Sequence, residues 1–285
     1  MTEINLFLDK MGHWVTNNEI FSKLYQIGAD KCDVLFIHSS LMDFGMPNPN
    51  LKRSVLLGEL YNIVMSLGVR NVLWPTFTFS FCNKQDYDVL KSASKMGALN
   101  EWARKNGGGA IRSLDPLMSV TLIGEDKELV LNIGHESCGA CSTYDMLHHR
   151  SDVKFLFVGP KIGSCMTYMH YLEWLYSVDY RYDRTFHGRI IKDDKIYEDD
   201  YVLFSRYKGV TPSDGTFEFE NRMYKNGTAQ RIECGDAGLS IVSAEKADIE
   251  YKKCLDENPY FFVDIEGGKL IKDKTFITTG EVVAM

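Results

Sequence analysis

Residues 153–176 read VKFLFVGPKIGSCMTYMHYLEWLY, and they give the clearest indication of the fold class. Residues 153–158 are almost all apolar, with the aromatic and β-branched side chains that are typical of a buried β-strand. A glycine-bearing loop at 159–164 leads into residues 167–176, which have the composition of a short helix. A strand, a loop and a helix in this order form the repeating unit of layered α/β folds. The stretch therefore predicts an α/β protein.

The segments before this stretch continue the alternation of helices and strands. Apolar residues between 55 and 67 recur at helical spacing, and Gly68 follows them as a typical C-terminal cap. Further helices are expected at residues 18–27, 97–105, 126–133 and 142–149, and strands at residues 34–37, 71–74 and 119–123. These lengths predict a three-layer fold whose central sheet is mostly parallel or mixed.

The last third of the chain has a different pattern. Short apolar runs between charged turns, including residues 201–205, indicate strands, and residues 244–255 indicate a helix. We therefore expect a smaller, partly antiparallel C-terminal lobe at about residues 180–265. Because no linker, repeat or low-complexity segment interrupts the chain, we place this lobe on one single domain, residues 1–285.

Composition argues against several classes of protein. The 285 residues are 45% hydrophobic and 25% charged, which suits a globular core, and the net charge of −7 argues against nucleic-acid binding. No apolar run approaches the roughly 18 residues of a membrane helix, and the first residues lack a signal-peptide pattern. The seven scattered cysteines are an odd set, as expected for reduced thiols. We expect a cytoplasmic protein that binds no membrane.

Thr167, His170 and Glu173 are spaced by three residues, so a helix beginning near Thr167 would place all three on one face. The positive end of a helix dipole disfavours protonation of a histidine in the first turn, which suits a general base. Glu173 would orient the ring, and the Thr167 hydroxyl would cap the helix or stabilise a developing oxyanion. On spacing alone, the favoured interpretation is that Thr167 is only a helix cap and that His170 and Glu173 are a surface pair. Half of a metal site is a third interpretation, but the further ligands that a metal needs are lacking.

Polar residues also follow the other predicted strands, where ligands gather in open α/β sheets. Ser39 and Ser40 follow the strand at 34–37 and could bind a phosphate or a pantetheine amide, or bond only the backbone of their own turn. Arg112 and Ser113 bring a positive charge and a hydroxyl that suit an anionic cofactor tail. These four residues are candidates for binding a cofactor.

The order of these motifs along residues 33–190 resembles that of the aminoglycoside 3-N-acetyltransferase family. The similar segments are His38-Ser-Ser-Leu41 with Gly45, Pro75-Thr-Phe-Thr-Phe-Ser80, Gly97-Ala-Leu-Asn-Glu101, Arg112-Ser-Leu-Asp-Pro116 with Ser119, Gly139-Ala-Cys-Ser142 and Thr167-x-x-His170-x-x-Glu173. The resemblance implies acetyl-CoA as co-substrate, no metal, and catalysis by His170 with Glu173 and Thr167. The cofactor-binding residues that we expect are then His38, Ser39, Ser40, Thr76, Arg112, Ser113 and Ser119.

The chemistry that we expect is direct transfer of an acyl group, acetyl above all, to an amino group. His170 would deprotonate the amine, and no cysteine or serine beside it is evidently placed as a nucleophile, Cys165 being the nearest. Two alternatives are a sugar- or nucleotide-binding protein without activity and a hydrolase that uses His170 and Glu173 to activate water. The sequence does not decide whether subunits assemble into a homo-oligomer.

The acceptor is a separate question. Residues 81–90 depart from the acidic-proline segment that antibiotic-modifying members tend to carry. This region and the part after residue 190 contain no dense anionic cluster, whereas Tyr87, Tyr180 and Tyr182 could stack on a sugar ring or a nucleobase. We therefore favour a small-molecule amino sugar, free or nucleotide-linked, over a polycationic aminoglycoside antibiotic.

Overall fold

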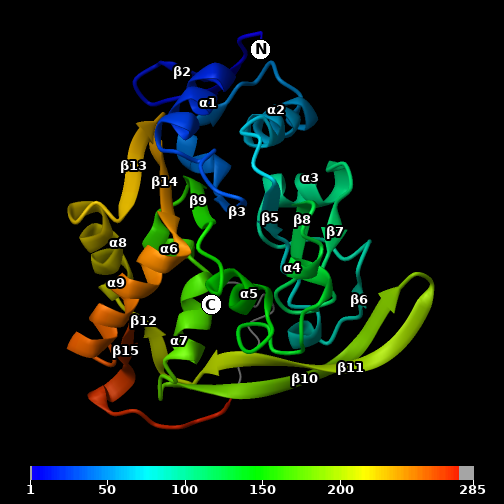
Figure 1. Cartoon of the computed structure of the whole chain (residues 1–285), viewed down its shortest axis with the longest axis vertical. Coiled ribbons are helices and arrows are strands. Elements are labelled where there is room, and N and C mark those ends of the chain that lie inside the picture. Colours follow the sequence, from blue (N-terminus) through cyan, green and yellow to red (C-terminus); the bar gives the residue numbers. More distant parts are fainter. Residues whose placement is uncertain (1, 276–285) are drawn as a thin grey trace.

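A seven-stranded sheet forms the centre of the protein (Figure 1), for which a computed structural model describes residues 2–275. In order across the sheet, the strands are β13 (Ala229–Cys234), β14 (Ala237–Ser243), β9 (Val153–Gly159), β3 (Val34–Ser39), β5 (Asn71–Pro75), β8 (Val120–Gly124) and β7 (Ile111–Arg112). β3 runs parallel to both β9 and β5, and the remaining pairs are antiparallel. The mixed sheet is confirmed, with its parallel part limited to three central strands.

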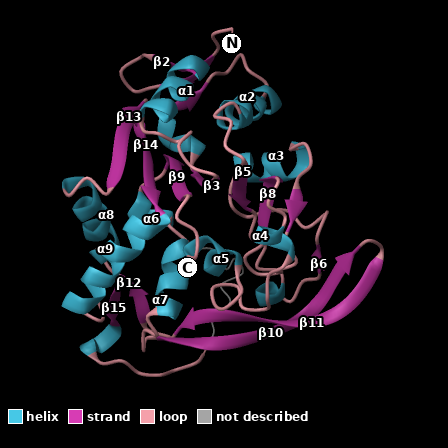
Figure 2. Cartoon of the chain, viewed as in Figure 1, coloured by secondary structure: helices cyan, strands magenta, loops and turns pink. Residues whose placement is uncertain are grey.

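Helices cover both faces of this sheet (Figure 2). On one face lie α1 (Asn17–Gln26), α2 (Arg53–Met65) and α3 (Ala98–Asn106). On the other lie α4 (Glu128–Leu131), α5 (Thr143–His148), α6 (Ile162–Cys165), α7 (Tyr168–Leu175), α8 (Gly215–Lys225) and α9 (Ala244–Glu257). Because successive side chains of a strand point to opposite faces, Val34 and Phe36 enter one core while Leu35 and Ile37 enter the other. The predicted three-layer fold is confirmed.

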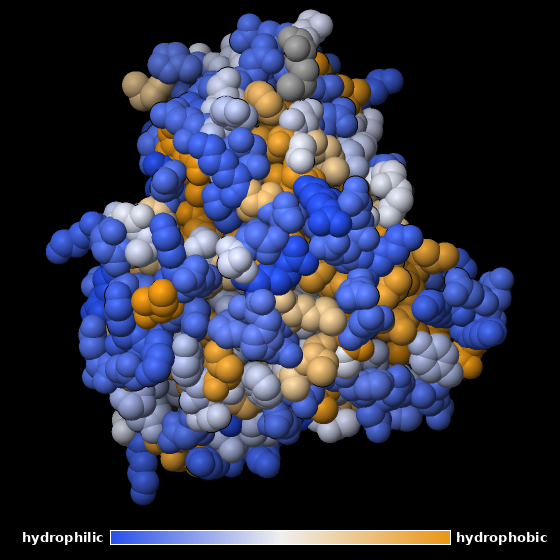
Figure 3. All heavy atoms as spheres, in the orientation of Figure 1, coloured by the Kyte–Doolittle hydropathy of each residue, from blue (hydrophilic) through white to orange (hydrophobic). Residues whose placement is uncertain are grey.

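Smaller sheets and short turns lie outside the central sheet. One sheet contains β1 (Asn5–Leu8), β2 (Trp14–Thr16) and β4 (Met46–Pro47), a second contains β12 (Val210–Pro212) and β15 (Val263–Ile265), and a third contains β6 (Tyr87–Asp88), β10 (Arg181–Lys192) and β11 (Lys195–Arg206). Short 3-10 turns are η1 (Leu41–Phe44), η2 (Phe81–Asn83) and η3 (Glu266–Gly268). The face shown in Figure 3 is mostly hydrophilic. Within residues 2–275, no helix is both long and apolar enough to cross a membrane.

β10 and β11 form one antiparallel hairpin with 12 residues in each strand, which projects as a curved arm (Figure 1). The sequence predicted only short strands here, because charged residues interrupt every apolar run. Much of the arm is exposed on alternate positions, so those charges face water without cost to the pairing. Its register places Arg181 directly opposite Arg206 at the open end of the hairpin.

The C-terminal third contributes to the central sheet as well as to the smaller sheets. β13 and β14 join the central sheet at its edge, where β14 pairs with β9. α9 lies where the sequence predicts a helix, whereas α8 was not predicted. Part of the expected lobe therefore completes the main sheet. The sequence did not predict this, because strand pairing over long sequence separations leaves no local pattern.

The loops after β3, β5 and β9 leave the same edge of the sheet, because these three strands are parallel. Gly159, the last residue of β9, has a φ of 103°, and a Cβ there would collide with the Ser40 carbonyl oxygen. The missing side chain lets the loops after β3 and β9 approach each other. This contact brings the two predicted groups of functional residues together.

We expect Gly159→Ala to lower the free energy of unfolding by about 1–3 kcal/mol or more, because alanine is strained at positive φ and meets backbone atoms. Chemical denaturation of both proteins measures the difference. Gly108→Ala is the matched control, since its Cβ would meet no atom within 4 Å. Equal losses for the two variants would show that the close approach of the loops is not required.

Candidate active site

Thr167 lies where the loop after β9 enters α7, but its side chain does not cap the helix as predicted. Its φ and ψ of −66° and −19° are already helical, and its hydroxyl bonds no backbone N–H of the first turn. Thr167 Oγ1 instead lies 2.6 Å from the Tyr144 hydroxyl and 3.2 Å from His38 Nε2. Strand parity explains the second contact, because His38 follows Val34 and Phe36 onto the face that α7 covers.

His38 is a buried ring that stays uncharged near neutral pH. The Thr167 backbone N–H lies 3.5 Å from Nε2, so we assign Nε2 as the acceptor and place the proton on Nδ1. Nδ1 is buried with no hydrogen-bond partner among the described residues, and the ring stacks on Phe157 with centroids 4.7 Å apart. Burial lowers the pKa of His38 from 6.5 to about 3. The neutral His38 ring is therefore a hydrogen-bond acceptor for Thr167.

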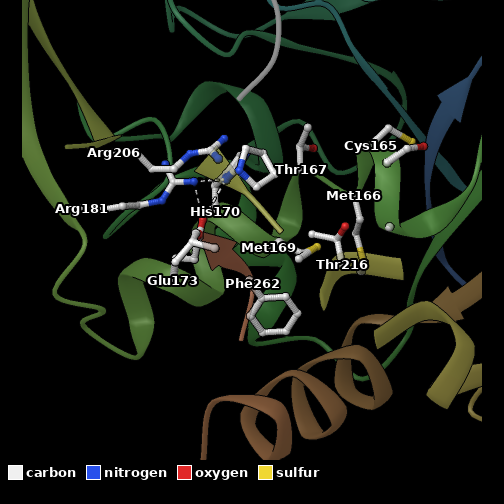
Figure 4. A pocket seen from close by; sticks show the side chains of 14 residues that line it. Cys165, Met166, Thr167, Met169, His170, Glu173, Arg181, Arg206, Thr216 and Phe262 are labelled. Atoms are coloured by element: carbon white, nitrogen blue, oxygen red, sulfur yellow. Dashed lines mark hydrogen bonds and ion pairs between the residues drawn. The ribbon is translucent and has the colours of Figure 1, made fainter. Parts of the chain in front are cut away.

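His170 and Glu173 are brought together as the spacing predicted, and Arg181 joins them (Figure 4). His170 Nδ1 lies 2.9 Å from Glu173 Oε2, and Arg181 Nη2 lies 2.6 Å from the same oxygen. Tyr180 donates its hydroxyl proton to Glu173 Oε1 at 3.2 Å. Arg181 Nη2 is also 2.9 Å from His170 Nδ1, but both nitrogens carry protons and both donate to the carboxylate.

This arrangement sets the protonation of the site. Burial, and then the charge of Arg181, lower the pKa of His170, which outweighs the opposing effect of Glu173. Burial alone would raise the pKa of the Glu173 carboxyl, but Arg181 and His170 lower it below its usual range. Glu173 is therefore ionised and accepts the Nδ1 proton, so the lone pair of the neutral ring is on Nε2. His170 Nε2 has no hydrogen bond among the described residues.

Two cavities meet at His170. The first, the strand-end cavity, lies at the loops after β3, β5 and β9, and its polar lining includes His38, Ser39, Ser40, Lys95 and Asn100. The second, the arginine cavity, is bordered by Glu173, Arg181, Arg206, Thr216 and Phe262 (Figure 4). Ser164, Cys165, Thr167 and His170 line both. The side chains of Thr167 and His170 therefore stand between two separate binding spaces.

The strand-end cavity holds three of the predicted cofactor-binding residues, His38, Ser39 and Ser40. Ser39 donates to Asn100 Oδ1 at 2.9 Å, and Asn100 donates to the Pro75 carbonyl oxygen at 2.8 Å. The Ser40 hydroxyl and the Lys95 ammonium have no side-chain partner among the described residues. A hydroxyl and a cation are thus available to an anionic or amide-containing ligand in this cavity.

Thr76, Arg112, Ser113 and Ser119, also predicted to bind the cofactor, line neither cavity. Arg112 is buried and donates to the carbonyl oxygens of Thr76, Val89 and Ser92 and to Ser119 Oγ. The other three hydroxyls bond neighbouring backbone groups. The four residues form a buried scaffold beside the strand-end cavity, and their predicted contact with a cofactor stays a prediction that this geometry does not favour.

The tyrosines predicted to stack on an acceptor are not in either cavity. Tyr87 is fully buried and donates to the Ser113 carbonyl oxygen, and Tyr180 is fully buried against Glu173. Tyr182 stacks on Tyr207 instead. The prediction of a stacking platform is not favoured for any of the three, because all three side chains are buried within the fold.

The site contains further residues that sequence reasoning missed. One group is Lys95, Asn100 of α3 and Tyr144 of α5. The other is the pair Arg181 and Arg206, which are the first and last residues of the paired hairpin strands. The spacing of three that reveals His170 has no counterpart for residues that meet only through tertiary structure. Within residues 2–275, no group of three or more His, Cys, Asp and Glu side chains could hold a metal ion.

The chain is similar in sequence to one protein family and in fold to several solved structures. A family model described as aminoglycoside 3-N-acetyltransferase matches residues 36–255. No curated protein sequence matches the chain significantly. Similar solved structures include AAC-VIa with sisomicin bound (16% identity, TM-score 0.71, 85% of this chain and 97% of that one) and AAC-IIIb in a binary complex with CoASH (14%, 0.70, 85% and 96%). The YokD protein from Bacillus subtilis is also similar (16%, 0.67, 85% and 93%). At these identities the structural likeness establishes the fold.

The buried neutral His38 predicts how stability depends on pH. Its pKa is about 3 in the folded protein and about 6.5 when unfolded, so the unfolded state binds one more proton between these values. Stability is therefore retained above pH 6.5 and lost as the pH falls below it, by up to about 1.4 kcal/mol per pH unit. Replacing the ring by an amide, His38→Asn, should flatten the curve by about that slope near pH 5. Urea unfolding from pH 7 to 4.5 tests this, and parallel curves for wild type and variant would contradict it.

Proposed function

The chain belongs to the aminoglycoside 3-N-acetyltransferase family and is an acetyl-CoA-dependent N-acetyltransferase, and we propose that it transfers the acetyl group directly to an amine of an amino sugar. The observation that carries the mechanism is the position of His170 between two cavities, with a proton-accepting nitrogen and a buried carboxylate behind it. Each cavity then receives one of the two substrates.

Acetyl-CoA would occupy the strand-end cavity. Ser40 offers an unpaired hydroxyl for an amide or phosphate of the bound molecule, and Ser39 is held by Asn100 beside it. Lys95 supplies the positive charge that the phosphates require, in place of Arg112 with its internal hydrogen bonds. This placement brings the thioester end to Thr167 and His170, which line both cavities.

His170 acts as the general base. The lowered pKa keeps the ring neutral, so Nε2 accepts a proton from the acceptor amine as nitrogen bonds to the thioester carbonyl carbon. Glu173 stabilises the imidazolium that results, through the hydrogen bond at Nδ1. When the tetrahedral intermediate collapses, the carbon–sulfur bond breaks and the thiolate of coenzyme A takes up the proton from His170 Nε2, which restores the neutral ring. The products are the N-acetylated amine and free coenzyme A.

Thr167 stabilises the oxyanion in this proposal. Tyr144 holds the Thr167 oxygen at 2.6 Å, and the hydroxyl proton turns from His38 Nε2 toward the oxygen that gains charge. Cys165 also lines both cavities, but burial raises the pKa of its thiol to about 12. A protonated thiol is a poor nucleophile, which favours direct transfer over an acetyl-cysteine intermediate.

The test of the general base is His170→Ala. We expect turnover to fall by roughly 100- to 10,000-fold, the usual contribution of a positioned base, while coenzyme A still raises the melting temperature. Thiol release from acetyl-CoA in the presence of an amino sugar measures turnover. The control is His135→Ala, which removes an exposed histidine outside both cavities. A folded His170→Ala protein with near-normal turnover would remove His170 from the mechanism.

A second test concerns the phosphates of coenzyme A. Lys95→Ala should reduce the melting-temperature shift caused by coenzyme A and leave the shift caused by pantetheine, which lacks phosphates, unchanged. Arg112→Ala, studied in parallel, should lower the melting temperature of the free protein, because it removes the hydrogen bonds to the carbonyl oxygens of Thr76, Val89 and Ser92. Equal losses of both ligand shifts in Lys95→Ala would place the phosphates elsewhere.

A further inference from the structure

Arg206 occupies an unusual position in the hairpin. It lies directly opposite Arg181 in the register of β10 and β11, and both guanidinium groups border the arginine cavity beside His170 (Figure 4). Like charges directly opposite each other destabilise an antiparallel pair. One carboxylate, Glu173, faces the two cations, so the pair is only half neutralised.

The two arginines differ in their partners. Arg181 forms an ion pair with Glu173 and donates to the Phe204 carbonyl oxygen, which fixes it in place. The Arg206 guanidinium has no hydrogen bond or ion pair among the described residues. Burial, and then Arg181, lower the pKa of Arg206 to about 10, so its group is still charged near neutral pH. The cavity therefore presents an unpaired guanidinium to whatever enters it.

The rest of the cavity adds no compensating charge. Apart from His170, Glu173 and the two arginines, its lining consists of uncharged residues: Gly163, Ser164, Cys165, Met166, Thr167, Met169, Pro212, Thr216, Phe262 and Val263. His170 is neutral, as argued above, and Glu173 already accepts from three donors. The net charge around the space is thus positive by one unit. A guanidinium is the side chain best suited to bind a carboxylate or phosphate through two parallel hydrogen bonds.

We propose that the arginine cavity selects an amino-sugar acceptor that carries an anionic oxygen group, a phosphate or a carboxylate, which binds Arg206 while the amine faces His170. The proposal rests on the assignment of this cavity to the acceptor. A polycationic acceptor would place ammonium groups next to Arg206 with no free carboxylate to receive them. The neutral and apolar lining instead suits a compact substrate with one amine and one anion.

The experiment compares specificity constants for thiol release with glucosamine, glucosamine 6-phosphate, glucosamine 1-phosphate, the carboxylate-bearing muramic acid, and gentamicin. Wild type should prefer at least one anionic amino sugar to glucosamine by about 10-fold or more, as charged hydrogen bonds predict. The phosphate and carboxylate substrates separate the two possible anions. Expressing the result as a ratio to glucosamine cancels any effect of the substitution on the base itself.

Arg206→Gln should reduce that ratio toward one, and Arg206→Lys, which keeps the charge, should retain part of it. Arg189→Gln is the matched control, because it removes an exposed arginine from the same hairpin outside both cavities, and it should leave every rate unchanged. A wild-type preference for glucosamine or gentamicin overturns the proposal, as does an unchanged ratio in Arg206→Gln. A loss of coenzyme A binding in that variant would assign Arg206 to the cofactor instead.

A binding measurement keeps the two proposals apart. If acetyl-CoA binds but no amine is acetylated, the assigned reaction fails, and titration calorimetry with inorganic phosphate and glucosamine 6-phosphate then tests the anion site alone. Binding that Arg206→Gln weakens by about 10-fold or more supports the site. Equal affinities in wild type and variant, or no binding in either, overturn it.

Discussion

The buried carboxylate of Glu173 is the group on which the rest of the site depends. It accepts hydrogen bonds from His170 of α7, from Arg181 at the start of β10 and from Tyr180, the residue before that strand. A buried charge that loses its partner costs about 3–5 kcal/mol, so these elements cannot separate cheaply. One carboxylate therefore fixes the orientation of the His170 ring, the tautomer of that ring and the point at which the hairpin joins the body.

The features that the sequence predicted are those with a local pattern. Residues 153–158 are apolar enough to mark β9, and the spacing of Thr167, His170 and Glu173 places three polar groups at one helix. The contact of His38 with Thr167 also follows from parity along β3, once the strand is known. Local pattern was thus sufficient for the strands at the centre of the sheet and for the segment that carries Thr167, His170 and Glu173.

The features that could not be predicted from the sequence depend on contacts between distant segments. Arg112 has the charge expected of a phosphate ligand, but its guanidinium is buried and donates to three carbonyl oxygens, whereas the Lys95 ammonium lines the strand-end cavity. Arg181 is the first residue of β10 and Arg206 is the last residue of β11, and each strand has 12 residues. Only the register of β10 with β11 brings the two arginines together. No pattern of residue types distinguishes these roles before the chain is folded.

The hairpin also divides the site in a way that matters for its evolution. Residues that line the strand-end cavity come from loops anchored in the central sheet, whereas Arg206 comes from the end of β11, a hairpin strand that belongs to a separate small sheet. Substitutions at the end of β11 can therefore alter one binding space without disturbing the loops that form the other. A lineage with this architecture can exchange one partner of its reaction while inheriting the other unchanged.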